Sequence, residues 1–151
     1  MAERCFQQAI AIQASCAAVE ACFRDLSLMH RWLNPLLRCH PVGEWSLNRG
    51  SRTQFQIQIP LLYPCLDCIV CDRSEGKIVW QFEGFFQGTD TWQWWPEADH
   101  TRLDNCFRFQ IAKPWIAWGF DRVAAGVTQR DMQAQLKRLK AIAESLPDDL
   151  T

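Results

Sequence analysis

The clearest structural signal in the chain is the stretch RTQFQIQI, residues 52–59. Phe55, Ile57 and Ile59 alternate with glutamines. This period of two predicts a β-strand with one apolar face and one polar face. Six further segments, separated by turn signals, also read as strands: residues 4–13, 36–45, 65–71, 77–83, 88–95 and 102–111.

Helical spacing is confined to two regions of the chain. Ser15 is placed to cap a helix over residues 16–25, and a second short helix follows over 27–32 and ends before Pro35. The last element is a helix over residues 116–146, with an apolar stripe formed by Met132, Leu136, Leu139 and Ala143. Phe120, Val123 and Val127 lie on its other side, so we expect either a change of buried face or a kink near Gly126.

This order of elements predicts an α+β fold in one domain over residues 1–151. Short connections favour antiparallel pairing, which gives a seven-stranded antiparallel sheet with one face to cover. The long C-terminal helix and the two short helices between the first two strands can cover that face. A sheet curved around the long helix leaves a space between them, and we expect that space to be an apolar pocket.

Composition excludes several classes of protein. Lys and Arg number 16 against 17 Asp and Glu, so there is no basic excess of the kind that nucleic-acid binders show. No apolar run is long enough for a transmembrane helix, and the N-terminus does not resemble a secretory signal. Eight cysteines without such a signal point to free thiols in a reducing, cytoplasmic setting. No heptad seam defines an oligomeric state.

Four segments carry a resemblance to a known superfamily: residues 14–25, Trp32-Leu33-Asn34-Pro35, Gly50-Ser51-Arg52, and residues 131–144. They resemble the SRPBCC, or START-like (Bet v 1-like), superfamily, and within it the polyketide cyclase/dehydrase and lipid-transport branch. The resemblance implies a helix-grip fold whose cavity binds lipids, polyketides or other hydrophobic molecules. Some relatives are cyclases or dehydratases, and no universal catalytic residue transfers to this chain.

The inward-facing positions of the predicted strands supply the walls of the expected pocket. Asn105 is the polar exception on one of these faces, either as a hydrogen-bonding handle for a ligand or as an amide paired with neighbouring backbone. The predicted ligand-binding residues are Phe55, Ile57, Ile59, Trp80, Phe82, Trp92, Trp94, Asn105, Phe107, Phe109 and, from the last helix, Phe120. The chain has eight tryptophans, which either line this pocket or fill it as core.

Asp90 is the one candidate for acid–base chemistry. If Asp90 faces inward with Trp92 and Trp94, burial raises its pKa, and His30 or Asn105 could complete a pair. The alternative is an aspartate exposed at the rim of the sheet. We therefore assign no catalytic residue.

Two other motifs attract attention, but neither is assigned a catalytic or metal-binding role. Cys65, Cys68 and Cys71 have ligand-like spacing, but the period of a strand places Cys68 on the opposite face from the other two, so we expect no metal or cofactor there. Phe85 and Phe86 lie between two glycines and are expected on a loop, where they could gate the pocket or make a transient contact with a membrane or partner.

The sequence thus favours binding or transport of a hydrophobic small molecule. The alternatives are a cyclase or dehydratase acting on a polyketide-like substrate, or a partner-binding module of the same fold.

Overall fold

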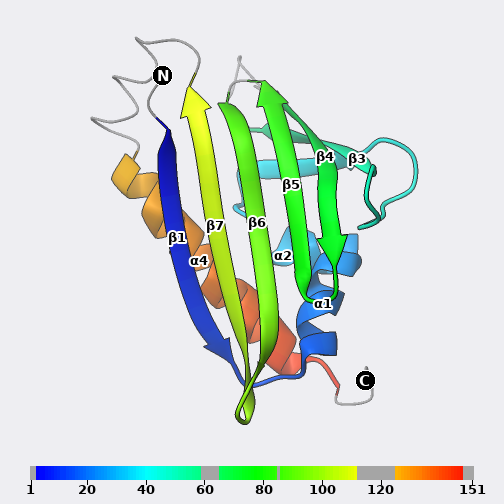
Figure 1. Cartoon of the computed structure of the whole chain (residues 1–151), viewed down its shortest axis with the longest axis vertical. Coiled ribbons are helices and arrows are strands. Elements are labelled where there is room, and N and C mark those ends of the chain that lie inside the picture. The colour runs from blue at the N-terminus through cyan, green and yellow to red at the C-terminus, as the bar shows by residue number, and fades with distance from the viewer. Residues whose placement is uncertain (1–2, 59–64, 85, 112–124, 148–151) are drawn as a thin grey trace.

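A computed structural model describes residues 3–58, 65–84, 86–111 and 125–147 of the chain (Figure 1). Seven antiparallel strands form one sheet in the order β1-β7-β6-β5-β4-β3-β2. The strands are β1 (Arg4–Ile12), β2 (Leu37–Pro41), β3 (Arg52–Ile57), β4 (Cys65–Ser74), β5 (Lys77–Gly84), β6 (Phe86–Glu97) and β7 (His100–Ile111). The predicted curved seven-stranded sheet is confirmed.

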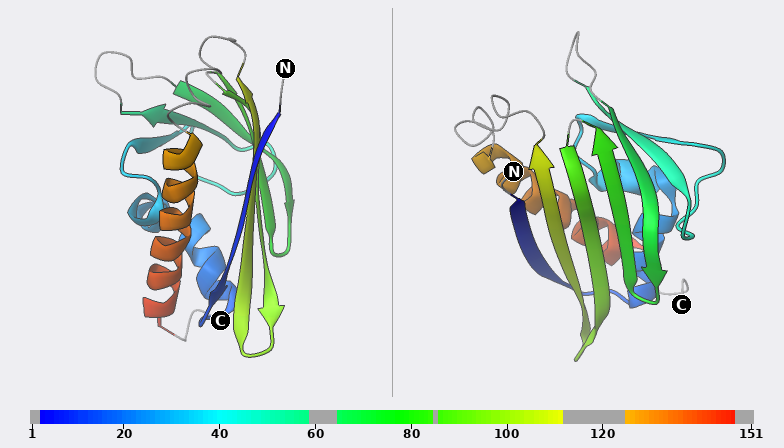
Figure 2. Two further views of the ribbon diagram at one scale, coloured as in Figure 1. Left: turned by 90° about the vertical axis from the view of Figure 1, so that its left-hand side faces the viewer. Right: turned by 45° about the horizontal axis from the view of Figure 1, so that its top comes forward.

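The helices in the described parts of the chain lie on one side of the sheet, as Figure 2 shows. They are α1 (Cys16–Arg24), α2 (Leu26–Trp32) and α4 (Ala125–Ser145). We call the face of the sheet that they cover the inner face. Its other face is turned toward the viewer in Figure 1.

Local capping explains where the two short helices begin and end. The hydroxyl of Ser15 accepts a hydrogen bond from the Ala18 backbone N–H at 3.1 Å, as predicted for an N-cap. Asp25 ends α1 and caps α2, because its carboxylate accepts from the backbone N–H groups of Ser27 and Leu28. The indole N–H groups of Trp32 and Trp45 donate to carbonyls in the last turn of α1, at Cys22 and Phe23.

Helix α4 is held by the apolar stripe that the sequence predicts. Met132, Leu136, Leu139 and Ala143 are all buried, and the helix packs on β1, α1 and α2. The structure describes the helix from Ala125 onward. The expected start at 116, Phe120, Val123 and the side chain of Val127 fall outside the described residues, as does the expected change of buried face.

Three strand predictions are corrected in detail. β2 ends at Pro41 rather than at residue 45, and Gly43 follows with a φ of +83°. Pro41 does not break the ladder, because β2 is an edge strand and the Val42 N–H still donates to the Arg52 carbonyl at 3.0 Å. β4 continues to Ser74 across a shift in register between Val70 and Asp72. The third correction concerns Phe86, which begins β6 and is not on a loop.

Candidate ligand-binding face

The inner face of the sheet is built from aligned rows of side chains. Strand register sets these rows, since paired residues on neighbouring strands point to the same side. One row joins Trp80, Asp90, Phe107 and Phe6, and the next joins Ile78, Trp92, Asn105 and Gln8. Most of the sequence-predicted wall residues therefore do share one face.

A tryptophan cluster fills the end of this face next to α1 and α2. Phe23 of α1 stacks on Trp94 at 5.0 Å between ring centroids and meets the edges of Trp32 and Trp92, each at 5.3 Å. Trp80 lies 6.3 Å from Phe23, and none of these five side chains is more than 4% exposed. In this part of the molecule the tryptophans are core, so the rings fill the space.

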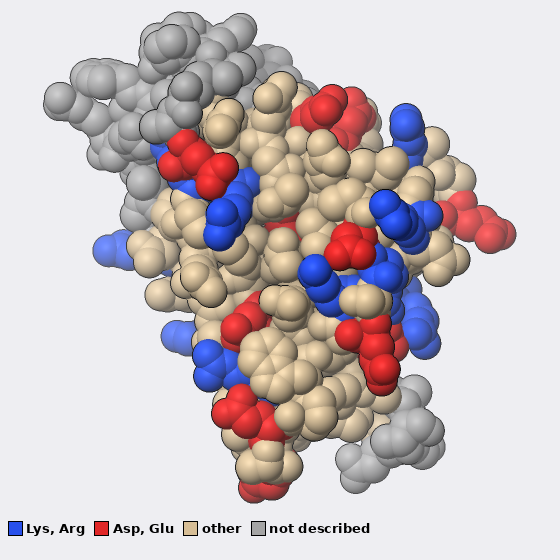
Figure 3. Space-filling model, in the orientation of Figure 1, with Lys and Arg blue, Asp and Glu red and all other residues tan. Residues whose placement is uncertain are grey.

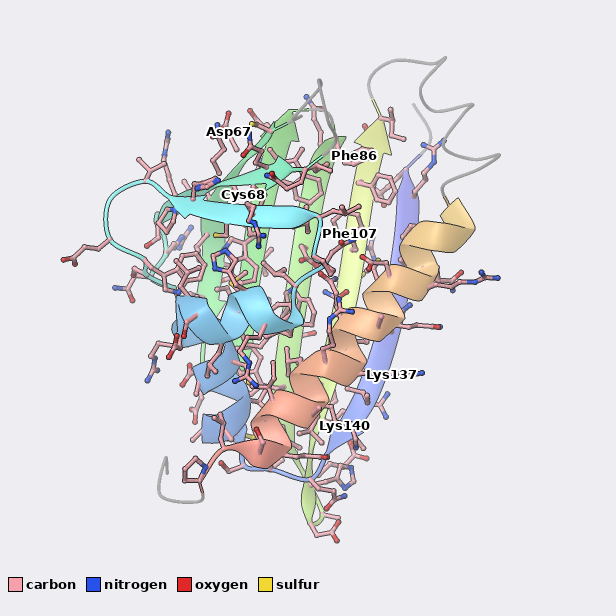
Figure 4. The ribbon with its side chains drawn as sticks, turned by 180° about the vertical axis from the view of Figure 1, so that it is seen from behind. Asp67, Cys68, Phe86, Phe107, Lys137 and Lys140 are labelled. Carbon is pink, nitrogen blue, oxygen red and sulfur yellow. The ribbon has the colours of Figure 1, made fainter. Side chains whose placement is uncertain are left out.

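A phenylalanine cluster occupies the other end of the same face. Phe107 stacks on Phe82 at 5.2 Å and lies 4.9 Å from Phe109. Phe6 and Phe86 pack against Phe109 at 5.8 and 5.3 Å. Figure 4, seen from the helix side, shows Phe86 and Phe107 toward the end of the sheet away from α1.

The phenylalanine cluster differs from the tryptophan cluster in exposure. Phe82 and Phe109 are buried, but Phe6, Phe86 and Phe107 all keep accessible surface. Phe86 thus packs within the face and is not an exposed half of a loop pair. Phe85, the other half of that pair, lies outside the described residues.

Gly88 lies between Phe82 and Phe109 in its row of paired residues. A Cβ at this position would stand 1.9 Å from the backbone oxygen of Arg108 and 2.7 Å from the Cα of Phe109. Glycine is therefore needed for β6 to approach β7 this closely, and no side chain separates the rings on either side.

A buried carboxylate marks the boundary between the two clusters. Asp90 accepts a hydrogen bond from the Trp92 indole N–H at 2.9 Å and another from the Asn105 amide at 2.7 Å. The residue keeps some accessible surface, yet burial of the carboxylate raises its pKa to about 6, against the lowering effect of both hydrogen bonds. The inward orientation of Asp90, Trp92 and Trp94 is confirmed, and the alternative of an exposed rim aspartate is wrong.

Only one of the two partners considered for Asp90 lies beside it. The Asn105 amide donates to Asp90 and also to the Thr91 backbone carbonyl at 3.2 Å, so side chain and backbone both satisfy it. His30 is engaged elsewhere, because its Nε2 accepts a hydrogen bond from the Cys39 backbone N–H at 3.2 Å. Burial and the nearby charges of Arg38 and His40 lower the pKa of His30.

Gln8 is a polar residue of this face that the sequence reasoning missed. Its amide nitrogen donates to the Gln129 carbonyl of α4 at 3.1 Å. Its Oε1 is buried, and no donor among the described residues reaches it. The signal was present in the sequence, because Gln8 interrupts the apolar series Phe6, Ile10 and Ile12, just as Asn105 interrupts its own strand.

The remaining predicted wall residues have mixed positions. Phe55 packs against the core, and Ile57 is partly exposed at the end of β3. Ile59 and Phe120 lie outside the described residues. Cys68 is buried on the inner face together with Val70, and burial raises the pKa of the Cys68 thiol.

The outer face carries a shallow polar groove of about 490 Å³ over β3, β4 and β5. Its lining includes Arg52, Asp67, Gln81 and Glu83, and Figure 3 shows acidic and basic side chains interspersed on this side of the molecule. Such a lining does not suit an apolar ligand. Within the described ranges, no three His, Cys, Asp or Glu side chains converge as a metal site requires.

Comparison with known proteins places this geometry among related folds. A family model described as polyketide cyclase / dehydrase and lipid transport matches residues 3–144. A search of curated proteins found no match. No helix in the described parts of the chain has the length and apolar character needed to cross a membrane.

Solved structures of the same fold are numerous. The protein TTHA0849 from Thermus thermophilus superposes with a TM-score of 0.74 at 17% identity, covering 93% of this chain and 97% of that one. The Zhui aromatase/cyclase from Streptomyces sp. R1128 gives 0.73 at 13% identity, with 95% and 94% covered. Major latex-like protein 151 from Panax ginseng gives 0.66 at 9% identity, with 96% and 99% covered. At these identities the likeness concerns the fold.

Proposed function

Because the chain belongs to the polyketide cyclase / dehydrase and lipid transport family, we propose that it binds and carries a hydrophobic small molecule on the inner face of its sheet. The ligand lies against the phenylalanine cluster formed by Phe6, Phe82, Phe86, Phe107 and Phe109. Eight free cysteines fit action in the reducing cytoplasm.

One observation carries this proposal: the phenylalanine cluster keeps accessible surface, whereas the tryptophan cluster on the same face does not. Phe6, Phe86 and Phe107 are partly exposed, whereas the tryptophan cluster on the same sheet is closed. Exposed apolar surface favours association with an apolar molecule by roughly 25 cal/mol for each Å² removed from water. Flat or aliphatic ligands fit such a surface, since rings stack and offer large contact areas.

Titration with 1-anilinonaphthalene-8-sulfonate, whose emission rises in apolar sites, tests the proposal. We expect saturable binding that Phe107→Ala weakens by about tenfold, because the variant removes a partly exposed ring from the site. Trp95→Ala is the matched control, since Trp95 is an aromatic residue 39% exposed on the outer face. Equal binding by both variants, or no binding by the wild type, would contradict the proposal.

A second candidate function rests on Asp90. A carboxyl group with a pKa near 6 beside the ligand face has the acidity suited to general acid–base catalysis, as a cyclase or dehydratase requires. On this hypothesis, Asp90→Asn abolishes cyclised product from a poly-β-ketone substrate while leaving probe binding intact. Absence of product with the wild-type protein rules this function out and leaves the carrier proposal standing.

A further inference from the structure

A buried oxygen without a donor lies on the inner face beside the phenylalanine cluster. Gln8 pairs across the sheet with Asn105, and Phe6, two residues away, belongs to the cluster. Two apolar residues, Phe6 and Ile10, flank Gln8 on its own strand, and both pack against the core. Gln8 is partly exposed as a residue, but its Oε1 atom is buried.

The hydrogen bond to α4 fixes which way the Gln8 amide is turned. Only the NH2 group can donate to the Gln129 carbonyl, so Oε1 is the atom left without a partner. A buried acceptor that gains no donor loses its hydration without compensation. Gln8 Oε1 therefore calls for a donor from outside the described residues.

The nearby polar groups are already committed. The two N–H groups of the Asn105 amide go to Asp90 and to the Thr91 carbonyl, and the Trp92 indole N–H also goes to Asp90. Rotating either donor toward Gln8 would leave a buried carboxylate less satisfied, which costs more than a neutral pair. A donor carried by the ligand would pair with Gln8 Oε1 and leave these hydrogen bonds intact.

We infer that the bound molecule is an apolar compound with a hydroxyl group, phenolic or aliphatic, and that this hydroxyl donates to Gln8 Oε1. The inference rests on the proposed function and adds the chemical class of the ligand. The hydroxyl lies at the polar row of Gln8 and Asn105 while the apolar body covers the phenylalanine cluster. An apolar molecule without a donor would leave Gln8 Oε1 unpaired.

Calorimetric titration with two matched pairs of compounds tests the inference. The aromatic pair is 2-naphthol and 2-methylnaphthalene, and the aliphatic pair is 1-octanol and heptyl methyl ether, in which an oxygen remains but the donor is lost. In the pair whose carbon skeleton resembles that of the natural ligand, we expect the hydroxyl compound to bind about tenfold more tightly than its partner without a donor. The pair in which the hydroxyl compound has the larger advantage in affinity shows whether the natural ligand carries a phenolic or an aliphatic hydroxyl.

Gln8→Met isolates the contribution of the acceptor. Methionine keeps the length of the side chain but has no comparable acceptor, so the preference for the hydroxyl compound should fall below about threefold. Gln7→Met is the matched control, because Gln7 is the exposed neighbour on the outer side of the same strand. Urea unfolding of both variants confirms that the sheet is intact.

The outcomes separate the two proposals. Equal affinities within both pairs for the wild type, or a preference that survives in Gln8→Met, overturns the hydroxyl inference and leaves the carrier function standing. Failure of all four compounds and of the anilinonaphthalene probe to bind overturns the carrier function and the inference together.

Discussion

Asp90 shows how two neighbouring residues hold a carboxyl group in an apolar environment. Trp92 and Asn105 each donate to one carboxylate oxygen, which favours the charged form, while burial favours the neutral form more strongly. The folded state therefore binds a proton more tightly than the unfolded chain does.

This raised pKa predicts a pH dependence of stability. Between about pH 4 and pH 6 the folded state binds more protons at Asp90 than the unfolded state, so the free energy of unfolding falls as pH rises. The contribution of this group is greatest below about pH 4 and levels off above about pH 6, with a total change of about 3 kcal/mol.

Asp90→Asn removes this dependence. Urea unfolding across that pH range should show the wild type losing stability relative to the variant by about 3 kcal/mol as pH rises. A constant difference between the two proteins at every pH would mean that Asp90 has an ordinary pKa in the folded state.

Cysteine reactivity follows burial in the same way. Cys22 is fully buried, and burial raises its pKa to about 11. Cys5 is exposed on β1, although desolvation and the neighbouring Cys106 thiol raise its pKa as well. In native protein at about pH 8, iodoacetamide should modify Cys5 before Cys22, because only Cys5 is accessible. Its reaction with Cys22 should be at least about 100-fold slower than in denaturant. Mass spectrometry of the modified peptides measures both rates, and early modification of Cys22 would show that α1 opens readily.

At the scale of single elements, the approach of β6 to β7 depends on Gly88. Gly88→Ala places a methyl group within 1.9 Å of the Arg108 backbone oxygen, and backbone cannot move aside as a flexible side chain can. We expect a loss of about 3 kcal/mol in the free energy of unfolding, at the upper end of overpacking effects.

Thr89→Ala is the control for that substitution, since Thr89 is the next residue of β6 and points to the other face. Its cost should be below about 1 kcal/mol. Similar losses for the two variants would show that the close approach at Gly88 is relaxed in solution.

Alternation in the sequence and short connections were enough to predict the seven strands and their antiparallel pairing. Helical spacing was enough to predict the apolar stripe in the described part of α4. Alternation could not place Phe86, because a pair of phenylalanines between two glycines reads equally well as a loop and as a tight connection between strands. The shift in register after Val70 was also hidden, because a bulge depends on pairing with β5 rather than on local pattern.

The site was only partly predictable for a related reason. Inward faces follow from period two, so Trp80, Phe82, Phe107 and Phe109 were placed correctly on the face. Which aromatic residues fill space and which keep exposed surface depends on where α1 and α2 dock. Gln8 was missed because a single glutamine in an alternating strand carries little signal without its buried surroundings.

At the scale of the whole molecule, one end of the inner face is closed by tryptophans and the other retains accessible phenylalanines. Trp94→Ala should cost about 3 to 5 kcal/mol in the free energy of unfolding, because that side chain is almost fully buried. Phe107→Ala should cost about 1 to 2 kcal/mol, because its ring is partly exposed. Urea unfolding measures both, and equal losses would contradict the division into a closed and an open end.

We propose above all that an apolar ligand lies against the phenylalanine cluster. The most direct measurement is isotope-filtered nuclear Overhauser spectroscopy on protein labelled at phenylalanine and tryptophan, with bound 2-naphthol. We predict contacts from the naphthol ring protons to Phe6, Phe86 and Phe107, the three rings of the cluster that keep accessible surface, and none to Phe23 or Trp94. Contacts confined to the tryptophan cluster, or to Trp95 on the outer face, would contradict it.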